Sequence, residues 1–271
     1  ELYLRHAYSS SLSNCRTMLA KQVSSGPGSS RLISMAHLGI PFVPPGFLPQ
    51  LHHMTRIDLR RNLLTSFPTE IVFLKNLQSI DIESNILTFI SEDLTARLGA
   101  VSPGLEELGL SGNALVALPA NLRVFAALTA LRVDNNELAE LPDLTAFPNL
   151  ASLNVSHNAA LRHLPPSLFS LTRLTCLRLA NIALTDLSDQ VGNLSLLSLL
   201  DVSGNAISAL PLTLRALRAL QTLNLEGNPL GDAGAAPAFG VSSLTDLNLS
   251  HTGLHQLPAE VGGLRGLVVL S

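Results

Sequence analysis

The chain offers few residues that could do chemistry. Its two cysteines, Cys15 and Cys176, lie far apart and match neither a disulfide framework nor a zinc-ligand spacing. Cys176 has no histidine or carboxylate placed by spacing to activate its thiol. His52 and His53 are adjacent, so in an extended segment their side chains point to opposite sides. The sequence therefore predicts no catalytic residue, no cofactor and no metal site, and we expect no enzymatic activity.

Two further motifs have a structural explanation. The segment SSGPGSS, residues 24–30, lacks the GxxxxGK[ST] pattern of a phosphate-binding loop and is typical of a flexible loop. Asn154, Asn193 and Asn248 each begin a glycosylation sequon. Two of these sequons fall inside a repeated strand pattern in which Asn and Ser are common. The loop indicates no activity, and the sequons are weak evidence for secretion.

Composition argues against several classes of protein. The net charge is −3 and the sequence pI is ≈ 6.2, which gives no sign of a basic nucleic-acid-binding surface. No apolar run approaches the roughly 20 residues that cross a bilayer. Hydrophobic residues make up 46% of the chain but aromatic residues only 4%, which suits a narrow leucine-filled core in an elongated fold. The low cysteine count favours a reducing compartment, so we expect a cytoplasmic protein.

A repeat accounts for most of the chain. The frame LxxLxLxxNxLxxLP first occurs at Met54 and recurs every 22 to 28 residues until Leu267. Position nine of the frame is not hydrophobic, so its recurrence is not a by-product of a leucine-rich composition. An asparagine there both donates and accepts hydrogen bonds, and we expect it to bridge the turns of adjacent repeats. This predicted asparagine ladder consists of Asn62, Asn85, Asn113, Asn136, Asn158, Asn205 and Asn228.

The frame also predicts local structure. In LxL, alternate residues of a short strand point inward and the residue between them points outward. Such a unit cannot bury its apolar side alone, so copies stack and share a core. We expect a parallel sheet on the concave face, and turns and short helices on the convex face. Residues 90–104 form a longer span, which predicts a helix capped by Ser91 and ended at Gly99.

These residues resemble the leucine-rich-repeat family over roughly residues 31–271. Segments such as LPPSLFSLTRL (164–174) and LPAEVGGLRGL (257–267) are similar to its typical 23-residue class. Within that class they resemble the intracellular Ras-suppressor and plant Ras-group repeat proteins. Residues 228–240 depart from the frame and resemble a ribonuclease-inhibitor-type module. The resemblance implies an α/β solenoid shaped as a curved horseshoe.

The frame also predicts the domain organisation. Residues 1–53 fit degenerate repeats that include a helix and the loop 24–30. Residues 54–271 hold about nine regular repeats and a truncated last one, and we expect both parts to form a single continuous solenoid. Neither end shows a polar capping module, so we expect the chain to be a fragment of a longer protein.

The outward strand residues suggest a binding surface. They are polar and of mixed charge, and small residues between them leave room for a partner. Arg132 and Arg178 are the expected anchors, because arginine forms two-pronged hydrogen bonds with carboxylates. Reversing both charges is expected to weaken binding without lowering thermal stability. The expected partner-binding residues are Arg56, Asp58, Arg60, Asp81, Glu83, Arg132, Asp134, Asn154, Arg178, Asp201, Asn224 and Glu226.

The sequence thus predicts a non-catalytic module that binds a protein partner on its concave face, with no nucleic acid and no membrane insertion. Two alternatives remain open. The chain could be a regulatory arm of a larger enzyme such as a kinase, GTPase, cyclase or ubiquitin ligase, or it could be a ligand-sensing receptor ectodomain. Fold alone does not choose among these functions.

One repeat breaks the pattern. In TCLRLANIALTDLSD, residues 175–189, Asn181 comes one residue before position nine, which Ile182 occupies. Sliding the register by one residue would turn Arg178 inward, and burying an unpaired arginine costs more than losing one set of ladder hydrogen bonds. We therefore expect a gap in the ladder at Ile182, and expect Ile182→Asn to stabilise the protein. Thr252 interrupts the ladder less, because its hydroxyl still donates and accepts.

Overall fold

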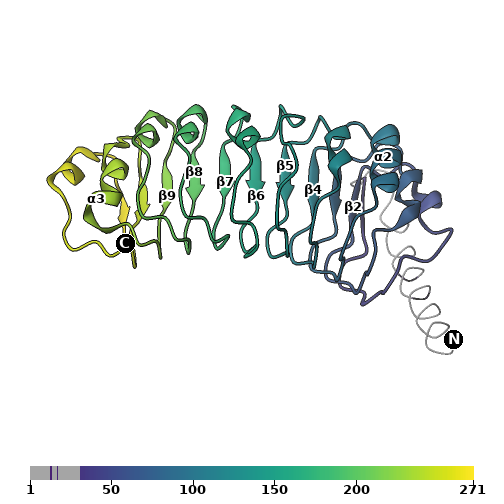
Figure 1. Cartoon of the computed structure of the whole chain (residues 1–271). Coiled ribbons are helices and arrows are strands. Elements are labelled where there is room, and N and C mark those ends of the chain that lie inside the picture. The colour runs from purple at the N-terminus through teal and green to yellow at the C-terminus, as the bar shows by residue number, and fades with distance from the viewer. Residues whose placement is uncertain (1–12, 14–16, 18–30) are drawn as a thin grey trace. The chain divides into compact units, whose positions relative to one another are not determined.

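The computed structural model describes residue 13, residue 17 and residues 31–271 (Figure 1). Two compact units make up the chain, Glu1–Asn136 and Glu137–Ser271, here called unit one and unit two. The predicted loop 24–30 and Cys15 lie outside the described residues.

Unit one is a stack of strand–turn–helix repeats. Its strands pair in parallel in chain order, and the buried central residue of each strand pairs with the central residue of the next. The strands are β1 (Leu32–Ser34), β2 (Arg56–Asp58), β3 (Ser79–Asp81), β4 (Glu107–Gly109) and β5 (Ala130–Arg132). The helices are η1 (Leu48–Leu51), η2 (Thr69–Phe73), α2 (Glu92–Val101) and η3 (Ala120–Val124).

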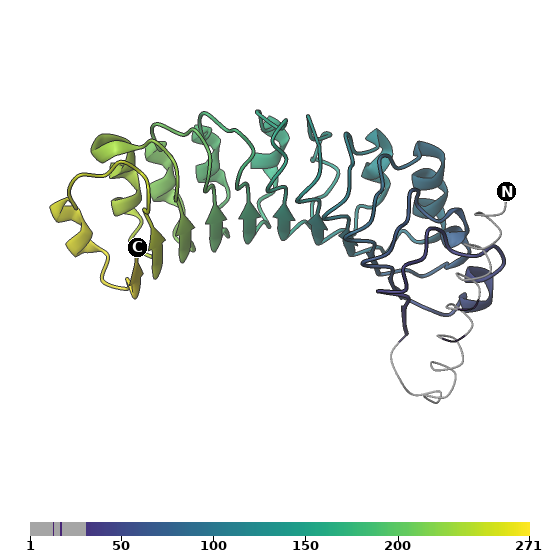
Figure 2. The same cartoon turned by 90° about the horizontal axis from the view of Figure 1, so that it is seen from below.

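Unit two repeats this arrangement, again with parallel strands paired in chain order. Its strands are β6 (Ser152–Asn154), β7 (Cys176–Arg178), β8 (Leu199–Asp201), β9 (Thr222–Asn224), β10 (Asp246–Asn248) and β11 (Val269–Leu270). Its helices are η4 (Pro166–Ser170), η5 (Asp189–Asn193), η6 (Leu212–Ala216), α3 (Gly231–Ala235), η7 (Ala236–Gly240) and η8 (Ala259–Gly263). In each unit the strands lie along one side and the helices along the other (Figure 2).

The Leu-Pro pair that ends the frame marks where the short helices begin. In five repeats the proline is the residue immediately before a 3₁₀ helix, with extended backbone. Proline suits this place because its ring fixes φ and its missing N–H is not needed there. The leucines of the frame fill the space between strands and helices and are almost all buried. The predicted α/β solenoid of stacked repeats is therefore confirmed.

The longer span at residues 90–104 forms α2. Ser91 precedes it, and the Ser91 Oγ accepts a hydrogen bond from the backbone N–H of Leu94 at 3.4 Å. The helix ends at Val101, so the predicted end at Gly99 was wrong. Gly99 lies inside the helix, where a Cβ atom would overlap the side chain of Val124 in η3. The glycine thus permits close packing of α2 on η3 and does not end the helix.

The ladder asparagines make a repeated set of hydrogen bonds. Asn85 is representative: its Nδ2 donates to the Ile82 carbonyl of its own repeat at 2.9 Å and to the Leu59 carbonyl of the preceding repeat at 3.0 Å. Its Oδ1 accepts from the backbone N–H of Leu64 in that preceding repeat at 3.0 Å. Each asparagine therefore satisfies backbone groups that the turns would otherwise bury unpaired.

The ladder is interrupted at Ile182, whose side chain is fully buried. The preceding repeat has one extra residue in its turn, and there the Leu161 N–H donates to the Asn158 carbonyl at 2.9 Å. That N–H therefore needs no asparagine at position 182. On the other side, the Asn205 Oδ1 accepts two backbone N–H groups, from Ile182 at 3.1 Å and Leu184 at 3.0 Å. The neighbouring repeats thus satisfy the backbone around the isoleucine.

The early asparagine has a backbone explanation. The residue before position nine has positive φ in every described repeat, as in His157 (57°), Asn181 (55°) and His251 (56°). Asparagine adopts this left-handed conformation more readily than most residues. Asn181 thus occupies the left-handed position of its turn, which asparagine also holds at Asn135.

The residue after position nine shows a second regularity. This residue has a left-handed backbone in the three repeats whose position nine is not asparagine. The residues are Gly39 (φ 63°), Ala183 (φ 56°) and Gly253 (φ 72°). Two of these three residues are glycine, which adopts positive φ without steric cost. Ala183 has a Cβ atom and therefore bears backbone strain at this site.

Candidate partner-binding surface

The strand face of each unit consists of the strand side chains that point away from the core. Its central row lies between the two buried positions of each strand. Many side chains in this row close an Asx turn, in which a side-chain oxygen accepts the backbone N–H two residues later at 3.0–3.2 Å. The residues that do so are Asp58, Asp81, Asn154, Asp201, Asn224 and Asn248. These Asp and Asn residues therefore hold the ends of the strands, whatever else they bind.

Five charged side chains of unit one form an ion cluster: Asp58, Arg60, Asp81, Glu83 and Arg132. Arg60 binds Asp58 with two hydrogen bonds of 3.0 Å, and its Nε lies 3.2 Å from the Asp81 carboxylate. The Arg132 Nε donates to the Glu83 Oε1 at 2.7 Å, and its Nη2 lies 3.8 Å from Asp81. The cluster thus joins β2, β3 and β5.

Arg132 reaches its partners by passing over β4. Gly109 lies directly beneath the guanidinium, and a Cβ atom there would lie 2.7 Å from the Glu83 Oε1 and 3.0 Å from the Arg132 Nη2. Any larger residue at position 109 would push the two charged groups apart. Gly109 is therefore what allows an ion pair between side chains two strands apart.

The cluster shifts the ionisation of its members. Burial, and then the charge of Glu83, raises the pKa of Asp81 to about 6, although Arg60 and Arg132 act in the opposite direction. Burial also acts to raise the pKa of Asp58, but the hydrogen bonds and charge of Arg60 bring it below its usual value. Burial acts to lower the pKa of Arg132, and the bond to Glu83 outweighs it. Arg132 is therefore held as a cation within the protein.

Arg178 of unit two is in a different environment. Its Nη1 lies 3.0 Å from the Cys176 Sγ, and within residues 137–271 it forms no ion pair. Asp201 is its register partner on β8, but that carboxylate accepts the N–H and the hydroxyl of Ser203 at 3.0 and 2.7 Å. The Arg178 guanidinium therefore retains donors that a partner could use.

The fold does not require an Asx residue at position 178. The backbone N–H of Ala180, which an Asx side chain would otherwise take, donates to the Ser156 Oγ of the preceding strand at 3.1 Å. Arg178 is thus a residue of the central row for which the structure shows neither a turn-closing role nor a carboxylate partner.

The remaining expected residues have varied surroundings. Arg56 is exposed on β2. Asp134 accepts from the hydroxyl of Ser111 and from Asn135, and Glu226 accepts from the Asn248 Nδ2 at 3.0 Å. Apart from Arg56, the sequence-based prediction did not include the first outward residue of each strand, such as Glu107, which accepts from the Ser79 hydroxyl at 3.2 Å. Strand alternation alone places these residues on the same face.

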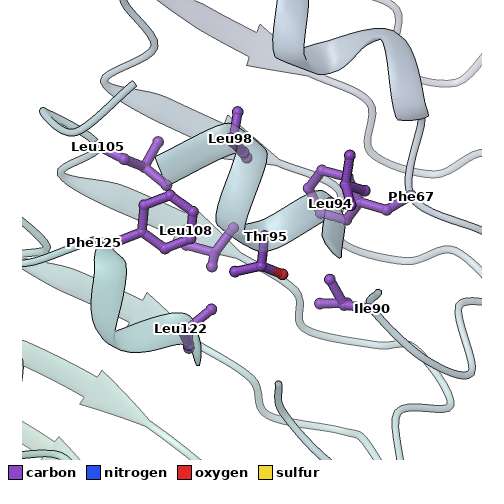
Figure 3. Close-up of a pocket in the computed structure, with 9 residues that line it drawn as sticks. All are labelled: Phe67, Ile90, Leu94, Thr95, Leu98, Leu105, Leu108, Leu122 and Phe125. Atoms are coloured by element: carbon purple, nitrogen blue, oxygen red, sulfur yellow. The ribbon is translucent and has the colours of Figure 1, made fainter. Parts of the chain in front are cut away.

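A small apolar pocket lies beside α2 (Figure 3). Its volume is about 10 Å³, no more than one water-sized sphere. The hydroxyl of Thr95 is the polar group of its lining, and it already donates to the Ser91 carbonyl at 2.9 Å. The lining residues are Phe67, Ile90, Leu94, Thr95, Leu98, Leu105, Leu108, Leu122 and Phe125. The pocket is therefore a packing gap in the core and not a ligand site.

The described residues contain no group of three or more His, Cys, Asp or Glu side chains placed to hold a metal ion. His52 and His53 do not point to opposite sides of an extended segment as predicted. They lie in the turn after η1, with their rings edge to face and 5.7 Å between centroids. In the described part of the chain, no helix is long and apolar enough to cross a membrane.

Stacked strand–turn–helix repeats, bridged by ladder asparagines, form a leucine-rich-repeat solenoid, and the chain resembles a leucine-rich-repeat family model and solved leucine-rich-repeat structures. The family model described as the leucine-rich repeats of leucine-rich repeat and WD repeat-containing protein 1 matches residues 68–162. The mouse protein of that name is 39% identical over 88 residues, which are 32% of this chain and 13% of that protein. The narrower resemblance to Ras-suppressor proteins is not confirmed by these matches.

Other relatives are long proteins of which the chain resembles a small part. The probable inactive serine/threonine-protein kinase roco10 of Dictyostelium discoideum is 37% identical over 115 residues, 42% of this chain and 4% of that protein. Among solved structures, a leucine-rich-repeat protein of Leptospira interrogans matches with a TM-score of 0.72 and 25% identity, over 85% of this chain and 63% of that one.

A receptor ectodomain is also similar. The leucine-rich-repeat ectodomain of the Arabidopsis thaliana membrane receptor kinase GASSHO1/SCHENGEN3 was solved in complex with CASPARIAN STRIP INTEGRITY FACTOR 2. It matches with a TM-score of 0.66 and 26% identity, over 83% of this chain and 30% of that one. The repeats of this chain are thus related to repeats that form parts of kinases and receptors.

Proposed function

We propose that the chain is a protein-interaction module whose unit two binds a protein partner on its strand face, with Arg178 as the anchor. The supporting observation is that Arg178 has no carboxylate partner in its own unit and closes no turn, although most of its row does. A carboxylate of the partner would accept two hydrogen bonds from its guanidinium. The kinship to the Arabidopsis ectodomain solved with a bound partner supports the same class of function.

The structure changes the expectation for Arg132. Its guanidinium already binds Glu83 and Asp81, so reversing its charge would break the ion cluster and reduce stability. Arg178→Glu breaks no ion pair that the structure contains. We therefore expect only the Arg178 substitution to separate a loss of binding from a loss of stability.

Site-specific photo-crosslinking tests this proposal. A benzoylphenylalanine placed at Leu199, which is the β8 register partner of Cys176, should capture a partner in cells. The same probe at Leu212 in η6 should capture no partner, because Leu212 lies on the opposite side of the unit, where its side chain is 68% exposed. Arg178→Glu should abolish the Leu199 adduct, whereas Arg162→Glu, a charge reversal in the turn after β6, should leave it. Equal adducts from both probes, or an adduct that survives Arg178→Glu, would contradict the proposal.

A second candidate function is that of a regulatory arm within a larger enzyme. It is supported by the relatives, of which the chain resembles only small parts and several of which are named as kinases. Sequencing the complete transcript would test it, since a catalytic domain in the same reading frame is required.

We also propose the cytoplasm as the compartment, because Cys176 is a free thiol. Thiol alkylation in intact cells, which labels only a reduced cysteine, tests that proposal.

A further inference from the structure

The two edges of unit two carry opposite charges. Its strands are parallel, so all turns that precede the strands lie at one edge and all turns that follow them lie at the other. The turns before β7, β9 and β11 contain the exposed residues Arg173, Arg218 and Arg265, here called the basic edge. The residues of this edge, 169–175, 193–198, 216–221, 240–245 and 263–268, include no Asp or Glu.

The opposite edge is acidic. Glu140, Asp186 and Asp232, here called the acidic edge, are exposed, and each lies four residues after position nine of its repeat. Arg162 is the one arginine in the equivalent turns of unit two. Apart from Arg162, the charged residues named on the two edges are thus separated by sign along the strand direction.

The charges on both edges have the same spacing. Successive acidic residues are 46 residues apart, and successive arginines are 45 and 47 residues apart, so both sets recur in every second repeat. Backbone hydrogen bonds stack the turns of the basic edge directly, from Ser198 to Thr175, from Gln221 to Ser198 and onward. Neighbouring strands lie about 4.8 Å apart, so charges in every second repeat lie about 10 Å apart on both edges.

The charged groups of these edges are largely available to a partner. Within residues 137–271, the three arginines form no ion pair, and Arg173 donates to the Asn149 Oδ1 at 2.8 Å. Asp232 accepts the His255 backbone N–H at 2.8 Å, and its second oxygen lies 3.8 Å from the His255 ring. The carboxylate of Asp186 accepts the neighbouring Thr185 hydroxyl at 2.9 Å.

We propose that unit two is self-complementary, with the basic edge of one copy docking on the acidic edge of a second copy. Arg173, Arg218 and Arg265 of one copy would face Glu140, Asp186 and Asp232 of the other, because both rows run in the same direction and have the same spacing. The contact joins two different surfaces, so copies add head to tail and the assembly is open. Exposed ion pairs are individually weak and screened by salt, so the association is weak and salt-dependent.

A second copy fits the basic edge better than an extended polyanion does. Residues 137–271 carry ten Asp and Glu residues and six Arg, a net charge of −4. That excess opposes the approach of any anion at long range, and a nucleic acid or an anionic membrane carries far more negative charge than a second copy does. The acidic edge of another copy offers negative charge at the matching spacing and is present wherever the protein is.

Sedimentation velocity of the full chain tests the proposal. The runs use pH 6.5, near the sequence pI of ≈ 6.2, where net repulsion between copies is small. At about 20 mM salt the weight-average sedimentation coefficient should rise with protein concentration, and at about 300 mM salt it should return to the monomer value. Replacing the three arginines of the basic edge by serine should remove the rise. Serine is a mild replacement, because Ser195 and Ser242 occupy the equivalent turns.

A charge exchange makes the test specific. A chain with Glu at the three basic positions, and a chain with Arg at the three acidic positions, should each fail to self-associate but should associate when mixed. A chain with both exchanges should self-associate again. Circular dichroism verifies that each variant is folded, and Arg97→Ser, Arg123→Ser and Arg162→Ser together form the control with the same change in net charge.

Four results would overturn the proposal. The first three are a monomeric wild-type chain at low salt, self-association that survives the serine variant, and failure of the double exchange to restore it. The fourth is loss of association in the control triple, which would make net charge and not the edges responsible. Arg178→Glu should leave self-association unchanged, so failure of this proposal and failure of the strand-face proposal are distinguishable.

Discussion

Replacing Ile182 by Asn should destabilise the protein, although the repeat pattern alone predicts the opposite. The sequence expectation assumed backbone groups waiting for an asparagine. In the structure, the Leu161 N–H that such an asparagine would accept already donates to the Asn158 carbonyl at 2.9 Å. The new amide oxygen would therefore be buried without a donor, in a site now filled by a fully buried isoleucine.

The magnitude follows from these contacts. Losing the buried isoleucine costs about 1.5–3 kcal/mol, and an amide oxygen without a donor costs about 1–3 kcal/mol. The new Nδ2 could donate to the carbonyls of Val155 and Leu179, which returns about 1 kcal/mol for each bond. We expect Ile182→Asn to lower the free energy of unfolding by about 0.5–4 kcal/mol.

Urea denaturation followed by circular dichroism measures this change. Ile182→Val, which removes one methyl group and adds no polar atom, is the control and should cost about 0.5–1.5 kcal/mol. Deleting Ala160 restores the regular length of the preceding turn and should free the Leu161 N–H for an asparagine at 182. The deletion combined with Ile182→Asn should therefore be more stable than Ile182→Asn alone, a positive coupling. A wild-type or higher urea midpoint for Ile182→Asn would refute this reasoning.

Three further predictions concern backbone strain and the ion cluster of unit one. Ala183→Gly should stabilise the protein by up to about 1 kcal/mol, because glycine adopts the positive φ at this position without strain. Ala206→Gly, at the equivalent place in a regular turn, is the control and should destabilise the protein. Thermal melts that rank the two variants in the reverse order would contradict this prediction. Gly109→Ala should lower the free energy of unfolding by about 1 kcal/mol, because it separates Arg132 from its partners. The same substitution should cause no further loss in a chain that already carries Arg132→Ala. A double-mutant cycle measured by urea denaturation tests this coupling. Asp81→Asn should be more stable than the wild type at pH 7.5 and lose that advantage at pH 4. Because the pKa of Asp81 is raised to about 6, the wild-type carboxyl is protonated at pH 4 and bears the cost of its buried charge at pH 7.5. A difference in unfolding free energy between the two proteins that does not change with pH would exclude this explanation.

Strand positions and turn types were predictable from sequence because they depend on local periodicity. The alternation in LxL gives the inward and outward residues, and the recurring asparagine gives the turns that must stack. The cap at Ser91 also follows from local chemistry. The end of α2 did not, because Gly99 is explained by a neighbouring helix and not by the helix that contains it.

The ionic contacts of the strand face could not be predicted for a related reason. Arg132 and Arg178 occupy the same place in their repeats, and sequence treats them alike. Gly109 opens a path from Arg132 to Glu83 two strands away, whereas Arg178 forms no ion pair within residues 137–271. Likewise, the left-handed Ala183 reflects the hydrogen bonds of Asn205 in the next repeat.

The compensation around Ile182 restricts the order in which repeats can follow one another. The Ile182 side chain gives no hydrogen bond to the turn of the preceding repeat, whereas the backbone N–H groups of Ile182 and Leu184 donate to the asparagine of the next repeat. It can therefore stand only behind a repeat with a longer, self-bonded turn and ahead of a repeat with an asparagine. A gene duplication that placed two copies of residues 174–196 in tandem would leave backbone N–H groups without acceptors, whereas a tandem copy of residues 197–219, which includes Asn205, would not. The asparagine ladder thus limits which repeats can be duplicated in tandem. A repeat with an asparagine at position nine can follow a copy of itself, whereas the Ile182 repeat cannot.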